Sequence, residues 1–236
     1  MRKFTISLIT LSWIALFGFS TASAGGIGVG FTAQYLNVEA DGKEVGSVTG
    51  NETDSSTNTA AVEHSTGLGS FYVEYALDNN FALGYESIPG AADVSGKTHI
   101  RVDTETSVSG DVTENSTSRQ FKAGAEVENY SVIYAEIPVY RGFYARVGYN
   151  EIDVNTLEVA SGNGGSYGNV TLNGMNYGVG FKMGTSGGIV TKLSYEVNDF
   201  DDLSITSSGN SADSGTNTLT ADLDTSAVKL AIGYQF

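Results

Sequence analysis

The sequence predicts an all-β fold: an eight-stranded antiparallel transmembrane β-barrel with short periplasmic turns and long extracellular loops, preceded by a cleaved signal peptide. Three observations favour it. Apolar residues after position 24 alternate with small, polar or charged ones at a period of two, as in a β-strand. The connections between the alternating segments are alternately long and short. The last segment keeps one apolar face to the final residue, Phe236.

The first 24 residues have the pattern of a secretory signal peptide. Arg2 and Lys3 give a positive start, a largely apolar stretch follows, and Ala22 and Ala24 match a small-residue cleavage site. We expect cleavage after Ala24 and a barrel over residues 25–236. A membrane-anchoring helix is the alternative, but the apolar stretch is shorter than the ~20 residues that a spanning helix needs.

The first four alternating segments each place apolar or aromatic residues on one face. Their opposite faces hold small residues and isolated charges, as a barrel strand between lipid and lumen requires. In chain order the apolar faces are Ile27, Val29, Phe31, Ala33 and Tyr35; Phe71, Val73, Tyr75 and Leu77; Phe81, Leu83 and Tyr85; and Ile133, Ala135, Ile137 and Val139.

The last four segments repeat the pattern with more glycine and more positive charge on the opposite face. Their outward residues are Phe143, Ala145, Val147 and Tyr149; Met175, Tyr177, Val179, Phe181 and Met183; Ile189, Thr191, Leu193, Tyr195 and Val197; and Leu230, Ile232, Tyr234 and Phe236. The final strand must pair with the first, because an unpaired backbone group in lipid costs several kcal/mol.

The connections alternate in length, as in barrels of the bacterial outer membrane. Short turns are expected at 78–80, 140–142 and 184–188, and long loops rich in Ser, Thr, Asn, Gly and Asp at about 40–67, 88–130, 151–171 and 198–224. The stretch THIRVDTETSV within the second loop also alternates, which leaves a ten-stranded barrel as an alternative. It carries no aromatic residue, so we interpret it as a strand extending above the membrane.

A secreted β-sandwich would also show many short strands and turns. It is disfavoured because aromatic residues recur near strand ends, as lipid-interface girdles require. Removing Arg2 and Lys3 from the 12 Lys and Arg leaves 10 against 27 acids, a net charge of −17 for the mature chain. That charge argues against nucleic acid, whose binding depends on cationic contacts to phosphate. There is no cysteine, so no disulfide supports the fold.

Several segments resemble the small outer-membrane β-barrel superfamily, which includes the OmpA membrane domain, OmpX and opacity-type porins. They are SFYVEYALDNNFALGYES, FYARVGYN, NYGVGFKMGTSGGIVTKLSYEVNDFDD and the terminal AIGYQF. The resemblance implies the outer membrane of a Gram-negative bacterium, with lipid, lipopolysaccharide, periplasmic chaperones and the barrel-assembly machinery as partners. It also implies that Leu230, Ile232, Tyr234 and Phe236 form the signal read by that machinery.

The inward charges are the main candidate site. Strand parity places four acids and four bases inside: Glu74, Glu86, Glu136, Glu196, Arg146, Lys182, Lys192 and Lys229. An eight-stranded barrel is just wide enough for side chains to fill, so this neutral set predicts a salt-bridged plug. A narrow ion path lined by the same groups is the alternative. We expect cross-strand or cross-lumen pairs Glu136–Arg146, Glu74–Lys182, Glu86–Lys192 and Glu196–Lys229.

Other candidate sites are weaker. His64 and His99 lie far apart in loops without partners for catalysis or metal binding. No G-x-S-x-G nucleophile motif indicates a hydrolase. Asp199, Asp201 and Asp202 offer carboxylates that suit a divalent cation, although no calcium-binding repeat surrounds them. We therefore expect no cofactor, no enzyme activity and a structural, envelope-integrity or adhesin-like surface-display role. A narrow porin-like channel for small solutes is the alternative.

Overall fold

The structure is a computed structural model that describes residues 26–46, 57–93, 99–109, 112–160, 166–184, 188–208 and 216–236. None of the described residues belongs to a helix that is long and apolar enough to cross a membrane. The strands are β1 (Gly26–Gly46), β2 (Thr57–Ala76), β3 (Ala82–Ser87), β4 (Ala91–Asp93), β5 (His99–Ser109), β6 (Val112–Tyr140), β7 (Phe143–Ala160), β8 (Val170–Gly184), β9 (Ile189–Phe200), β10 (Leu203–Thr206) and β11 (Asn217–Gln235).

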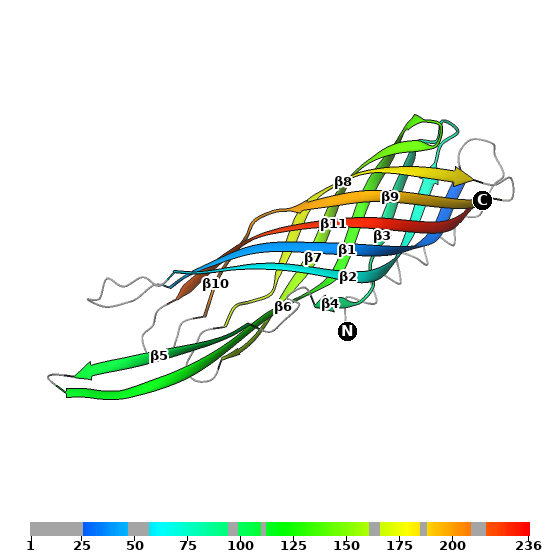
Figure 1. Ribbon diagram of the computed structural model, residues 1–236. Helices are drawn as coiled ribbons and strands as arrows, with labels where there is room; N and C mark the ends of the chain where they lie inside the picture. The colour runs from blue at the N-terminus through cyan, green and yellow to red at the C-terminus, as the bar shows by residue number, and fades with distance from the viewer. Residues whose placement is uncertain are drawn as a thin grey trace.

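Eight of the described strands close into an antiparallel ring (Figure 1). Their order is β1, β2, β3, β6, β7, β8, β9 and β11, and β11 pairs back with β1 from Gly28↔Gln235 to Gly46↔Asn217. The backbone N–H of Phe236 donates to the carbonyl of Ile27 at 2.9 Å. The closed barrel predicted from the alternation is therefore confirmed, and its last strand is paired to its end.

An apolar belt surrounds the ring on its outer face. On β1 it runs from Val29 through Phe31, which is 60% exposed, to Tyr35, and polar residues follow from Asn37. Aromatic rings touch edge to face within the belt, for example Phe31 and Phe71 with centroids 4.8 Å apart. A continuous apolar surface of this extent fits lipid and not water.

The strands continue well beyond the segments that hydrophobicity predicted, so the expected loop boundaries were wrong. The β1–β2 ladder runs on to Val45↔Thr57, inside the segment expected to be the first loop. Beyond the belt the outward side chains face water and are polar. The alternation of apolar and polar residues therefore disappears from the sequence there, although the backbone ladder continues. The alternating stretch in the second expected loop forms β5, which pairs with the outer part of β6 and not within the ring, and the β5–β6 hairpin leaves the barrel as a separate arm (Figure 1).

The interior of the barrel has two parts. Near the short turns it holds charged side chains and tyrosines, and toward the long loops it holds an apolar cluster. The cluster includes Leu36, Val38, Val127, Tyr130, Val132, Tyr134, Ile152, Val154, Leu172, Phe200, Leu203, Leu223 and Ala227. The polar part follows from the inward parity of the predicted strands, whereas the apolar part was not predicted.

Candidate functional site

All eight inward charges come from strands of the ring and lie inside the barrel. Glu74 lies on β2, Glu86 on β3, Glu136 on β6 and Arg146 on β7, while the other four come from β8, β9 and β11. Seven of them are buried, and the side chain of Lys182, at the short-turn end, is 14% exposed. The period-two backbone turns every second side chain inward, so the ring brings acids and bases from distant parts of the chain together.

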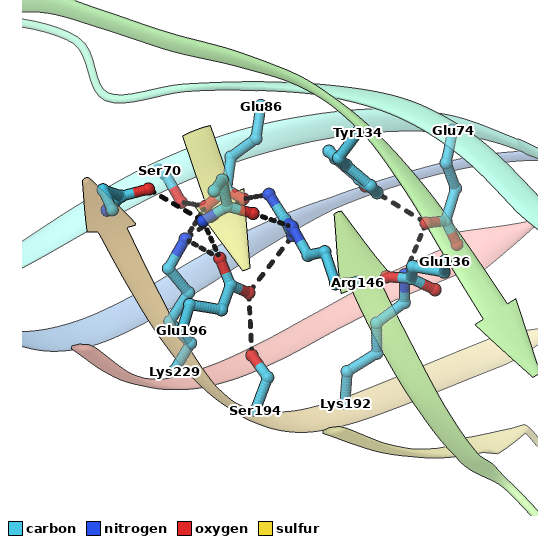
Figure 2. A network of polar contacts seen from close by, with 12 residues as sticks. Ser70, Glu74, Glu86, Tyr134, Glu136, Arg146, Lys192, Ser194, Glu196 and Lys229 are labelled. Atoms are coloured by element: carbon cyan, nitrogen blue, oxygen red, sulfur yellow. Dashed lines mark hydrogen bonds and ion pairs between the residues drawn. The ribbon is translucent and has the colours of Figure 1, made fainter. Parts of the chain in front are cut away.

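Four of the charges form the Glu86 cluster, which consists of Glu86, Arg146, Glu196 and Lys229 (Figure 2). Arg146 Nη2 lies 2.7 Å from Glu86 Oε2, and its Nη1 lies 3.2 Å from Glu196 Oε1. Lys229 Nζ lies 3.1 Å from Glu86 and 2.9 Å from Glu196. Each acid therefore contacts both bases, and the cluster has no net charge.

The Lys192 cluster lies nearer the short turns and consists of Glu74, Glu136, Lys182 and Lys192. Lys192 Nζ donates to Glu74 and, at 2.6 Å, to Glu136 Oε1. Lys182 lies 3.5 Å from the other oxygen of Glu136. This second set again balances two acids with two bases.

Tyr134 connects the two clusters. Its hydroxyl donates to Glu74 at 3.2 Å, and the Arg146 guanidinium lies 3.7 Å from the centre of its ring (Figure 2). Gly84 leaves room for this ring, since a Cβ built on Gly84 would lie 2.3 Å from it. The aromatic face adds cation–π attraction to the ion pairs of Arg146.

Most of the predicted ion pairs were wrong, although one is formed. Glu136 and Arg146 are neighbours across the β6–β7 ladder, as expected, but their charged groups make their ion pairs elsewhere. The Glu74–Lys182 and Glu86–Lys192 pairs are likewise replaced by Glu74–Lys192 and by Glu86 with Arg146 and Lys229. The Glu196–Lys229 pair is present. Register decides which backbones are adjacent, but long side chains reach across the lumen to partners that the barrel stagger selects.

A layer of neutral hydrogen bonds covers the Glu86 cluster, and we call it the Asn198 layer. Asn198 Oδ1 accepts from Asn176 at 2.8 Å, Asn150 at 2.9 Å and Tyr130 at 3.0 Å, and its amide donates to Thr225 at 2.8 Å. Asn176 also accepts from Arg146 Nε at 3.0 Å, which joins the layer to the charges. Sequence reasoning missed this layer because Asn198 was assigned to a loop, although it has the inward parity of β9.

The other candidate residues do not come together as a site. His64 lies on β2 and His99 on β5. Within the described ranges, no group of three or more His, Cys, Asp or Glu side chains is arranged to hold a metal ion. Asp199 lies opposite Asp224 in the β9–β11 ladder. Asp224 also lies opposite Glu39 in the β1–β11 ladder.

The stability of the fold should depend on pH through Asp224, which lies at the outer rim of the barrel, beyond the apolar belt. Partial burial, followed by the charges of Asp222, Asp199 and Glu39, raises its pKa above the usual carboxyl value. A raised carboxyl pKa in the folded state means that ionised Asp224 destabilises the fold at neutral pH, and that this cost disappears on acidification. We expect Asp224→Asn to raise the urea midpoint at pH 7, with the gain shrinking toward pH 4. An equal gain at both pH values would contradict this origin, and Asp201→Asn is the matched control for loss of a surface charge.

Comparison with known proteins identifies similar structures only. No family model matches the chain, and no curated protein matches it. OprG, an outer membrane protein of Pseudomonas aeruginosa, is 12% identical over 89% of this chain and 96% of its own, with a TM-score of 0.48. Ail, the attachment invasion locus protein of Yersinia pestis, is 12% identical over 90% and 98%, with a TM-score of 0.39. The outer membrane protease OmpT of Escherichia coli is 8% identical over 93% and 99%, with a TM-score of 0.40.

Proposed function

We propose that this protein is a closed outer-membrane barrel that does not conduct, holds its long loops and the β5–β6 hairpin at the cell surface, and contributes to envelope integrity. The observation that carries this proposal is the mutual pairing of all eight inward charges in two neutral clusters. The apolar belt supports the membrane location. The role is non-enzymatic, since the charged groups of the interior are engaged with one another.

Burial favours a plug over a water-filled path. The ion-paired side chains of both clusters are 1–6% exposed, apart from Lys182. Charged groups that line a conducting path keep contact with water and passing ions. Here three of the four carboxylates accept hydrogen bonds from two or more protein donors, as Glu86 does from Arg146, Lys229 and Ser70. The fourth, Glu136, accepts one from Lys192 and is ion-paired with Lys182 at 3.5 Å.

Conductance of the purified protein in a planar bilayer tests the proposal. We expect no steady unitary conductance from the native barrel. Heat-modified gel migration of the same reconstituted sample is the control for folded insertion. A triple variant with Glu74, Glu136 and Lys192 changed to Ala should stay silent as well, because the Glu86 cluster and the Asn198 layer remain across the lumen. Reproducible single-channel steps from the native protein would overturn the plug and support the alternative, a narrow porin-like channel.

Export through a cleaved signal is part of the same proposal, and residues 1–24 lie outside the described residues. Because Ala22 and Ala24 match a cleavage site, the mature protein should begin at Gly25. N-terminal sequencing of the protein from an outer-membrane fraction measures this. Recovery of chains beginning at Met1 from that fraction would refute the processing step.

A further inference from the structure

The arm formed by β5 and the outer part of β6 has one regular free edge, on β5. That strand pairs with β6 from His99↔Ala123 to Ser109↔Val112, and no other described strand pairs with it. Natural edge strands are commonly protected from further pairing by proline, lysine, a bulge or a very short length. β5 has 11 residues and contains neither proline nor lysine. The bulge of the arm lies on β6 instead, where the ladder skips Asn115.

The free edge lies well outside the membrane. Gln120, which pairs with Val102 of β5, and Ile133 of the apolar belt are 13 residues apart on the same strand, β6. At ~3.3 Å per residue this separation is about 40 Å along the strand. The arm also leaves the barrel at the end remote from the C-terminus (Figure 1). A strand of another protein molecule can therefore reach β5 without entering lipid.

The arm is neutral, although the whole chain has a formal net charge of −15. Over residues 99–109 and 112–123, three bases balance three acids: Arg101, Arg119, Lys122, Asp103, Glu105 and Glu114. A large net charge of one sign keeps copies of a protein apart. The neutral arm lacks this repulsion, so it is the part of the chain where two copies can approach each other.

The order of charges along β5 is self-complementary. When two copies of β5 pair antiparallel about a two-fold axis at Val102, Arg101 lies opposite Asp103 of the second copy and His99 lies opposite its Glu105. The symmetry makes each of these pairs occur twice. An axis one residue away, at Arg101 or at Asp103, sets that charged residue opposite its own copy. Opposite charges at opposed positions stabilise a sheet and like charges destabilise it, which selects the axis at Val102.

The same charges disfavour pairing of two arms in one membrane. Such arms point in the same direction, so their β5 strands would pair in parallel. In register, this pairing sets Arg101, Asp103 and Glu105 each beside its own copy, and an offset of two residues sets Asp103 beside Glu105. Antiparallel pairing instead requires arms that point toward each other, as arms on two facing membranes do.

We propose that β5 is a homophilic contact, in which arms from two facing outer membranes pair antiparallel about Val102. The two hairpins then form one four-stranded sheet, and the partner of each arm is a second copy of this chain. This inference rests on the surface display proposed above and names the partner of the displayed arm. One pair of strands is a small interface, so adhesion depends on many copies acting together between the two surfaces.

Single cysteines test the register, since the chain has no cysteine of its own. Val102→Cys brings two copies to directly opposed positions, with Cα atoms ~4.5–5.5 Å apart, which a disulfide can span. Thr104→Cys is the matched control, because its own copy would lie four residues along the second strand, about 13 Å away. In phosphatidylcholine vesicles, mild oxidation should give covalent dimers of Val102→Cys and few of Thr104→Cys. Labelling of both variants by a membrane-impermeant maleimide before oxidation measures the fraction of arms that face outward.

Either of two results would contradict this register. Equal cross-linking of the two variants would indicate parallel or random contacts, and no cross-linking of outward-facing Val102→Cys would indicate that the arms do not pair. Cross-linking of Val102→Cys in vesicles that do not aggregate would place the contact within one membrane and overturn the facing arrangement.

Charge reversal tests recognition between vesicles, with aggregation measured by light scattering. Arg101→Asp leaves acids at positions 101 and 103 and should reduce aggregation several-fold. Asp103→Arg combined with Arg119→Asp leaves bases at both positions and keeps opposite charges across the β5–β6 ladder, so it should also fail to aggregate alone. An equal mixture of the two kinds of vesicle should aggregate like the native protein, because opposite charges again lie opposite each other.

The mixture decides whether copies of β5 recognise one another. If both variants are folded by heat-modified gel migration and their mixed vesicles do not aggregate, the homophilic contact is wrong. Conductance is measured separately, so the two proposals can fail independently. Native protein that conducts and still aggregates vesicles would refute the plug alone, and silent protein that never aggregates them would refute the contact alone.

Discussion

Replacing Arg146 with Ala is expected to lower the free energy of unfolding by about 3–5 kcal/mol, the usual cost of leaving a buried charge without its partner. The substitution leaves Glu86 and Glu196 with Lys229 as their remaining ion-pair partner in the Glu86 cluster, and it removes the contact with the Tyr134 ring. Urea titration of the barrel in lipid vesicles measures the change. Arg141→Ala, at the turn between β6 and β7, is the matched control and should cost less than about 1 kcal/mol.

Double-mutant cycles test which acid Arg146 depends on. Glu86→Ala combined with Arg146→Ala should recover part of the loss, because Arg146→Ala leaves one excess negative charge in the Glu86 cluster and Glu86→Ala removes it. Glu136→Ala combined with Arg146→Ala should be nearly additive, although these residues are neighbours in the ladder. Coupling near zero for Glu86 with Arg146 would show that water screens the pair, and it would favour the pore over the plug.

The contrast between Glu86 and Glu136 also marks how far the sequence predicts the site. Period-two alternation is a backbone property, so parity alone assigns every charged side chain of the predicted strands to a face. Which acid pairs with which base depends on the stagger of the strands in the barrel and on side-chain length. Neither factor produces a periodic pattern in the sequence. Arg146 illustrates this, since its register neighbour is Glu136 and its ion-pair partners come from β3 and β9.

The outer half of the interior was missed for a different reason, and its signal is present in the sequence. On β1 the outward apolar series ends at Tyr35, and the apolar residues then change parity to Leu36 and Val38, which point inward. The same change follows Tyr149 on β7, where Ile152 and Val154 are buried. A change of apolar parity within one continuous strand thus marks the depth at which lipid ends outside and the apolar cluster begins inside.

Phe236→Asp is expected to reduce the amount of folded protein in the outer membrane several-fold. Phe236 is 66% exposed toward lipid, and its ring lies edge to face against Tyr234 with centroids 4.9 Å apart. An acid on the lipid face near the interface costs little in stability, about 0–1 kcal/mol, and the backbone bond of Phe236 to Ile27 does not need the ring. A large loss in cells would therefore come from assembly and not from the finished barrel, as expected if Leu230, Ile232, Tyr234 and Phe236 form the signal that the resemblance implies.

The matched variant Phe143→Asp tests whether the loss of folded protein comes from failed assembly or from the loss of an aromatic ring that faces lipid. Phe143 is 56% exposed and lies at the same short-turn end of the barrel, but it is not in the final strand. Its ring is tilted by 55° against that of Phe181, with centroids 4.9 Å apart. Both Asp variants should refold in detergent with similar yields, since each removes one lipid-facing ring. In cells, heat-modified gel migration of membrane fractions should show a much larger loss for Phe236→Asp. Equal losses of folded protein in the two variants would show that the effect comes from removing a lipid-facing aromatic ring. The last strand would then have no special role in assembly.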